Sequence, residues 1–234
     1  MAATILSAAP GRPNFYLAMA VVSLVIVAMG FAPSFYLKSW TDAPQLPALV
    51  HVHGLVFSAW ILLFVAQAAL VRAGNVATHR RLGVAGACLA VGLLVFGYVT
   101  AIEAARRGHN PAGFRDAMAF LAVPIVDLVV FVPLLAGALW WRTRPDIHKR
   151  LMLLATLSLL GAPLARFPYI EQSALSLLPY AALALACPLH DWLVARRVHP
   201  AFVWGTAWYI AAIFVRGALG ASETWHAFAV WLTS

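Results

Sequence analysis

The chain has 234 residues, of which 63% are hydrophobic and only 10% are charged, and its formal net charge is +8. Soluble domains carry about 25% charged residues, so this composition excludes an ordinary soluble enzyme or binding domain. The apolar runs are continuous and do not alternate as the strands of a membrane barrel do. The sequence therefore predicts an all-α polytopic helix bundle in a membrane.

Seven apolar runs occupy nearly the whole chain, and each has about the 20 residues that a helix needs to cross a bilayer core about 30 Å thick. They predict a single integral membrane domain over residues 1–234. In chain order the expected spans are about 15–36, 46–71, 82–104, 117–141, 151–170, 173–195 and 201–222. The tail, 223–234, carries aromatic residues at helical spacing and is expected to lie in the membrane interface.

Basic residues gather in alternate loops, which is typical of the cytoplasmic side of a membrane protein. The loops after the second, fourth and sixth spans carry Arg72, Arg80, Arg81, Arg142, Arg144, Lys149, Arg150, Arg196 and Arg197. We therefore expect the N-terminus inside, the C-terminus outside, and a multi-pass location in a bacterial inner (cytoplasmic) membrane. The charge is explained by topology, so the lipid bilayer is the expected partner and nucleic acid is not.

The second span carries a polar and aromatic stripe. His53, Phe57, Trp60, Phe64 and Gln67 are spaced by four, three, four and three residues, which keeps them within a narrow sector of a helix. Lipid does not favour His or Gln on its own face, so the stripe, including Trp60 and Gln67, is expected to face the bundle interior.

Near the outer end of the same span, His51 and His53 form a His-x-His pair. Imidazole suits copper and zinc, so these two residues are candidate metal ligands and a candidate entry point for a transition metal.

One short motif occurs twice, as His79-Arg80-Arg81-Leu82 and as His148-Lys149-Arg150-Leu151. Each copy lies at the end of a basic loop and at the start of an apolar run. The basic residues are explained as topology anchors, but each His has two interpretations: an interfacial anchor, or a ligand of haem or a metal just inside the membrane.

Small residues follow the first of these His along the third span, at Gly83, Gly86, Ala90 and Gly97. The groove that they form predicts either close helix packing or a slot for a flat macrocycle held by His79.

Two charges lie deep in spans and require partners. Asp127 lies in the middle of the fourth span, and Arg166 follows His148 by five helical turns in the fifth. We expect Asp127 to pair with Arg166, with Glu171 as the alternative partner, and either a structural or a transport role for the pair. Arg216 in the last span is expected to reach the outer interface by snorkelling.

His190 ends the sixth span beside Asp191. A carboxylate can orient an imidazole that binds a metal. The candidate cofactor-binding residues are therefore His53, His79, His148 and His190.

The segment 51–83 contains His51-x-His53-Gly54, then Trp60 and Gln67, and then His79-Arg80-Arg81-Leu82-Gly83. This pattern resembles the diheme transmembrane cytochromes b that accept electrons from ascorbate. The resemblance implies haem b, with His53 as an outer ligand and His79 as an inner one. The second outer His of that family has no counterpart within a predicted span, so an inner haem between His79 and His148 or His190 is the clearer expectation.

The chain also resembles uncharacterised bacterial multi-span proteins that share two motifs. These are the His-Arg-x-Leu-Gly loop, here 79–83, and the His-Lys-Arg-Leu-Met-Leu-Leu-Ala-Thr run, here 148–156. That resemblance brings no established activity.

Three functions follow as hypotheses. The first is a b-type haem-binding electron-transfer protein, with a quinone or a redox protein as partner; if it is an enzyme, it is a transmembrane oxidoreductase. The second is a non-catalytic subunit or scaffold of an oligomer or larger complex. The third is a copper carrier or chaperone, although the spans lack the Cys-x-x-Cys and Met pairs that favour soft metals.

Overall fold

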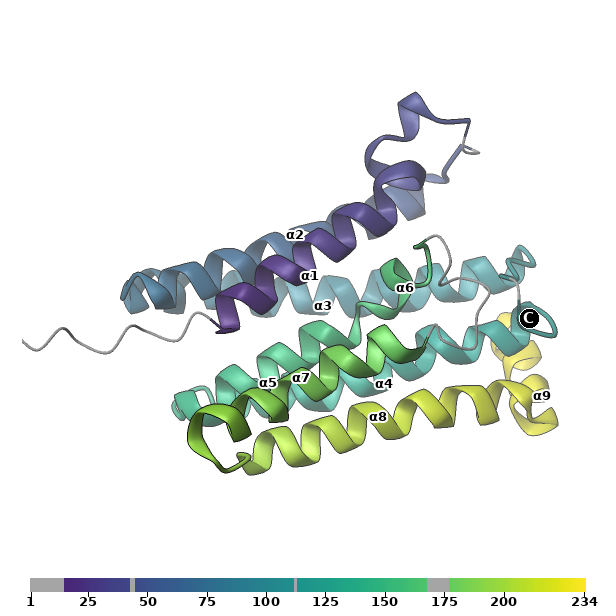
Figure 1. The fold of residues 1–234 in the computed structure, drawn as a ribbon. Coiled ribbons are helices and arrows are strands. Elements are labelled where there is room, and N and C mark those ends of the chain that lie inside the picture. The colour runs from purple at the N-terminus through teal and green to yellow at the C-terminus, as the bar shows by residue number, and fades with distance from the viewer. Residues whose placement is uncertain (1–14, 43–44, 112, 168–176) are drawn as a thin grey trace, which may run out of the picture.

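The computed structural model describes residues 15–42, 45–111, 113–167 and 177–234, and every regular element in these segments is a helix (Figure 1). The long helices lie roughly along one another and form a single bundle. The elements are α1 (Phe15–Phe31), the π-helical turn η1 (Ala32–Tyr36), the 3-10 turn η2 (Lys38–Trp40), α2 (Ala48–Arg72), α3 (Val76–Arg106), α4 (Ala117–Trp140), α5 (Pro145–Ser158), α6 (Gly161–Leu164), α7 (Leu177–Ala195), α8 (Pro200–Ala221) and α9 (Glu223–Thr233).

Within the described segments, six helices are long and apolar enough to cross a membrane. They are α1 continued by η1, α2, α3, α4, α7 and α8. The all-α membrane bundle expected from composition is confirmed, whereas the expected fifth span is not one continuous helix.

The fifth segment is interrupted between α5 and α6. Pro163 has no N–H to donate to the carbonyl of Leu159, and its ring clashes with that carbonyl, so the helix stops at this point. The 14 residues of α5 extend about 21 Å at 1.5 Å per residue, which is shorter than a bilayer core. Leu153, Leu154 and Leu157 of α5 are completely buried, so α5 is an interior element covered by its neighbours.

Two tyrosine hydroxyls bond to the last carbonyls of α5, of which that of Leu157 also accepts the Leu160 N–H at 3.0 Å. Tyr180 of α7 donates to the Ser158 carbonyl at 2.8 Å, and Tyr209 of α8 donates to the Leu157 carbonyl at 3.2 Å. The last carbonyls of any helix need such partners, and in an apolar interior water cannot supply them. The break in the fifth segment is therefore stabilised by α7 and α8.

The two ends of the bundle differ in their connections. The α2–α3, α4–α5 and α7–α8 connections lie together at the left of Figure 1, and α9 lies at the opposite end. We call these the basic end and the α9 end. The three connections at the basic end are the basic loops of the sequence, so the alternation on which the topology prediction depends is present in the fold.

The most extensive helix–helix packing is between α2 and α3, between α4 and α5, and between α4 and α8. Close approach of α8 to α4 requires a glycine, because a Cβ at Gly220 would lie 2.6 Å from the Ala119 carbonyl oxygen. Small residues permit such approach between membrane helices. This close approach brings the end of α8 against the start of α4.

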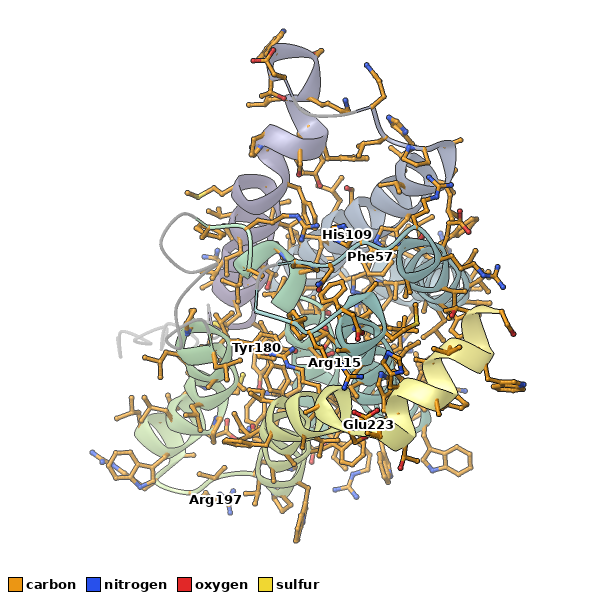
Figure 2. The ribbon with its side chains drawn as sticks, turned by 90° about the vertical axis from the view of Figure 1, so that its right-hand side faces the viewer. Phe57, His109, Arg115, Tyr180, Arg197 and Glu223 are labelled. Carbon is orange, nitrogen blue, oxygen red and sulfur yellow. The ribbon has the colours of Figure 1, made fainter. Side chains whose placement is uncertain are left out.

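The tail forms α9 and packs over the ends of α3, α4 and α8. Ser222 caps it by accepting the Trp225 N–H, and the Trp225 indole donates to the Met118 carbonyl at 2.8 Å. Figure 2, which looks along the bundle from this end, shows Arg115 beside Glu223 at the start of α9. Phe228 and Trp231 stay exposed, as an interfacial aromatic anchor requires.

Candidate functional site

The histidines of the two repeated motifs lie close together at the basic end. The ring centres of His79, near the start of α3, and His148, in the first turn of α5, lie 6.2 Å apart with their planes at 79°. The third helix begins at Val76, earlier than the expected residue 82, because Asn75 caps it by accepting the Thr78 N–H. His79 therefore lies inside a formed helical turn.

A backbone hydrogen bond orients His148. Its Nδ1 lies 2.8 Å from the carbonyl oxygen of Ala138, near the end of α4. A carbonyl can only accept, so Nδ1 carries the proton, and Nε2 of the neutral ring keeps its lone pair. Hydrogen bonds of this type orient histidines that bind metals through the other nitrogen.

Unpaired polar groups lie close to the two histidines. Nδ1 of His79 and Oε1 of Gln67 are buried, and neither has a hydrogen-bond partner in the described part of the chain. A Cβ at Gly83, one turn after His79, would lie 3.8 Å from Nε2 of Gln67. Unpaired buried polar groups are costly, so this corner between α2 and α3 is suited to a ligand that offers hydrogen bonds.

The five stripe residues of α2 are all buried or half-buried. Trp60 is 3% exposed and packs edge-on against Phe131, with ring centres 5.6 Å apart. His53 stacks on Phe57 at 4.2 Å and its Nδ1 lies 3.3 Å from the Phe96 carbonyl oxygen. The stripe thus faces neighbouring helices, with His53 toward the α9 end and Gln67 toward the basic end.

His51 and His53 do not converge. His51 is exposed and its Nδ1 bonds to the Pro47 carbonyl at 3.2 Å, while His53 stacks on Phe57. Two residues apart on a helix means about 200° of rotation. Among the residues that the structure describes, no three or more His, Cys, Asp or Glu gather to hold a metal ion.

His190 lies at a different place from His79 and His148. Its ring stacks on Phe15 of α1 at 3.8 Å, and its Nδ1 lies 3.8 Å from an Asp191 oxygen. Of the two candidates expected to join His79, the structure therefore brings His148 and not His190.

Side chains fill the groove of small residues below His79. A Cβ at Gly86 would lie 3.2 Å from Leu63, and one at Gly97 would lie 3.3 Å from Leu128 and 3.4 Å from Phe57. This part of the groove serves helix packing. Its first position, Gly83, instead lies beside the Gln67 side chain.

The deep carboxylate Asp127 pairs with Arg216 of α8 and not with Arg166, which corrects the expected pairing. Nη1 of Arg216 lies 3.3 Å from Oδ1 of Asp127, and the two side chains are 12% and 17% exposed. Arg166 donates to the Ala162 carbonyl and lies over the Phe31 ring, and Glu171, its alternative expected partner, lies outside the described residues. The expectation assumed an unbroken helix from residue 148 to 166, but the break before α6 removes that common face.

A buried ion pair at the basic end was missed by sequence reasoning. Nε and Nη2 of Arg150 donate to the two carboxylate oxygens of Asp191, both at 2.8 Å, and Nη1 donates to the Asp146 carbonyl at 2.7 Å. The two side chains are only 13% and 5% exposed. A carboxylate such as Asp191, near the end of an apolar span, needs a cation at the same depth in the membrane. A search of the sequence for such a cation could have identified Arg150.

His199 completes the arrangement, which we call the Asp191 network: Asp146, Arg150, Asp191 and His199. The His199 N–H donates to Asp191 at 3.2 Å. Its Nδ1 accepts from the Ala201 N–H, so Nε2 carries the proton and donates to Asp146 at 3.2 Å. The network joins the starts of α5 and α8 to the end of α7.

Comparisons with protein-family models, with curated proteins and with solved structures gave no match to this chain. The functional argument therefore depends on the geometry of the basic end.

Proposed function

We propose that the protein is a membrane electron-transfer protein that binds one b-type haem at the basic end, with His79 and His148 as axial ligands. The observation that carries this proposal is the 6.2 Å separation of the two ring centres. A transition metal lies about 2 Å from an imidazole nitrogen, so two imidazoles on opposite sides of one metal have ring centres roughly 6 Å apart. The distance between the two ring centres in the fold is close to that value.

The surroundings of the two rings support the same cofactor. His148 has its Nδ1 proton fixed on Ala138, which leaves Nε2 available as a ligand. The ligands come from different helices, α3 and α5, as b-type haem ligation by two imidazoles requires. Arg80 directly follows His79, and a cation there suits the negatively charged propionates of haem.

Bound haem would supply reversible one-electron chemistry, with a potential set by the axial ligands and by burial. We propose a membrane quinol or a redox protein as the partner, and the cytoplasmic side of a bacterial inner membrane as the location of the basic end. The aromatic ring that stacks on His53 is that of Phe57 and not a second imidazole. We therefore propose His53 as a ligand of a second, outer haem only if the measured stoichiometry exceeds one haem per chain.

The direct test is the absorbance spectrum of protein purified after haem-replete expression. Wild type is expected to show a Soret band with about one haem per chain, and His79→Ala and His148→Ala are each expected to lose it. His190→Ala is the matched control, because His190 lies at the same end but stacks on Phe15, and it should keep the band. A wild type without a Soret band, or a band that survives both ligand substitutions, would overturn the proposal and favour a scaffold role.

A further inference from the structure

We propose that Asp191 is a positioning residue for His148, acting through Arg150. This inference rests on the proposed function, since it assigns to the Asp191 network the task of holding one axial ligand toward the other. Asp191 lies near the end of α7, and its carboxylate receives both Nε and Nη2 of Arg150.

The first turn of α5 is held from two opposite sides. His148 and Arg150 are two positions apart, so their side chains leave the helix about 200° apart. His148 bonds to the Ala138 carbonyl of α4, and Arg150 bonds to Asp191 of α7. A rotation of this turn that kept one attachment would break the other. The direction of the His148 ring toward His79 is therefore fixed jointly by α4 and α7.

The attachment to α7 is a closed ring of hydrogen bonds. Arg150 donates to the Asp191 carboxylate and to the Asp146 carbonyl, while His199 donates its backbone N–H to Asp191 and its Nε2–H to the Asp146 carboxylate. Every member bonds to two others. Asp146 and Asp191 each accept from both Arg150 and His199, but only Asp191 accepts all of these bonds on its carboxylate and lies on α7. Its carboxylate therefore connects α7 to α5 and to the start of α8.

The chemistry of the pair requires a carboxylate. A guanidinium presents two parallel N–H donors, and only a carboxylate offers two matching acceptors. An amide at position 191 keeps the size but supplies one acceptor and a competing donor. Asp191→Asn should therefore leave Arg150 incompletely paired in a buried place and loosen the first turn of α5.

The first measurement does not require haem. Cys88 and Cys187 are the free cysteines of the described chain, so both are changed to Ala. His79→Cys and His148→Cys are then introduced together and treated with a short bis-thiol cross-linker. We expect efficient cross-linking in this background and a clear loss when Asp191→Asn is added, with Asp191→Glu restoring part of it.

The second measurement uses the haem-loaded protein with its native histidines. Loss of a residue that orients a metal ligand typically weakens metal affinity 10- to 100-fold. We expect haem dissociation in Asp191→Asn to be faster by roughly this factor, with part of the ferric haem changing from low spin to high spin as His148 leaves. Arg150→Lys should give the same change, because Lys cannot form the two parallel bonds.

The matched control is Asp116→Asn at the α9 end, where a carboxylate also pairs with an arginine, Arg115. It should leave the cross-linking yield and the haem spectrum as in wild type. Unchanged cross-linking and unchanged spin state in Asp191→Asn would overturn the positioning role. Loss of cross-linking in a protein that binds no haem would keep the positioning of residue 148 and reject the haem proposal alone.

Discussion

The basic end and the α9 end use the same residue types with very different burial. At the basic end the side chains of Arg150 and Asp191 are 13% and 5% exposed. At the α9 end the side chains of Arg115 and Glu223 are 47% and 82% exposed, although their closest atoms are only 2.6 Å apart. Exposed pairs contribute about 0–1 kcal/mol, whereas removing one partner of a buried pair costs about 3–5 kcal/mol. Distance alone therefore does not rank these interactions.

This difference indicates where each end can tolerate change. The basic end holds the neighbouring rings of His79 and His148 together with the buried Arg150–Asp191 pair, so we expect a single substitution in that pair to affect both folding and the candidate site. The α9 end holds its helix by exposed ion pairs and by a small apolar cluster in which Trp225 and Ala229 of α9 are buried. The following predictions test this contrast from the largest expected effect to the smallest.

Asp191→Ala should destabilise the protein by about 3–5 kcal/mol, because it leaves Arg150 buried without its partner. Glu223→Ala, which removes a partner of the exposed Arg115, should cost much less, because solvent screens an exposed pair. Denaturant unfolding in one detergent measures both. Equal losses in the two variants would contradict the contrast between the ends.

Arg216→Ala should destabilise by about 3 kcal/mol, since Asp127 would be left unpaired within the bundle. Arg166→Ala is the informative companion, because the sequence alone had made Arg166 the partner of Asp127. Unfolding free energies should show the larger loss for Arg216→Ala. A larger loss of unfolding free energy for Arg166→Ala than for Arg216→Ala would contradict the Asp127–Arg216 pairing.

Tyr180→Phe should destabilise by about 1–2 kcal/mol, because it removes the hydroxyl that satisfies the Ser158 carbonyl at the end of α5. Tyr36→Phe is the control, since its hydroxyl bonds to Ser58 at an exposed position, and it should cost less than half as much. Thermal unfolding of the two variants side by side makes the comparison. If the two variants melt together, the break between α5 and α6 does not depend on α7.

The smallest expected effect is a pH dependence at the α9 end. The Ala119 N–H, Arg115 and His226 hold the pKa of Asp116 below its usual value. A carboxyl group with a lowered pKa in the fold stabilises it above the unfolded pKa, about 3.9, and this contribution is lost as pH falls through the folded pKa. Stability of wild type should therefore decline below about pH 4, and Asp116→Asn should decline less over the same range. Parallel pH profiles for the two proteins would reject this role.

Much of the fold could be predicted from hydropathy. The bounds expected for α2, α4 and α8 agree with the structure to within two residues, because each apolar run ends at charged, polar or proline residues. Pro163 predicts a bend in the fifth span, and the structure has a full break there between α5 and α6. Membrane helices tolerate proline when neighbours supply hydrogen bonds around it. The hydroxyls of Tyr180 and Tyr209, which bond to the Ser158 and Leu157 carbonyls beside the break, come from distant parts of the chain.

The candidate site was predicted only in outline. The repeated motif identified His79 and His148, but spacing along the chain could not decide whether His148 or His190 would approach His79. That choice depends on which face of α5 meets α4, which Ala138 and Asp191 determine through contacts across 10 and 41 residues of sequence. Arg150 and Asp191 were missed because one was explained by topology and the other was assigned to its neighbour His190.

The most direct test of the central claim is the ferric electron paramagnetic resonance spectrum of the haem-loaded protein. If His79 and His148 bind one iron from opposite sides, wild type should give a single low-spin signal. His148→Ala should then convert this signal to high spin or lose the haem, and His190→Ala should leave it unchanged. A wild type with no low-spin haem signal, or one that His148→Ala does not alter, would contradict the account.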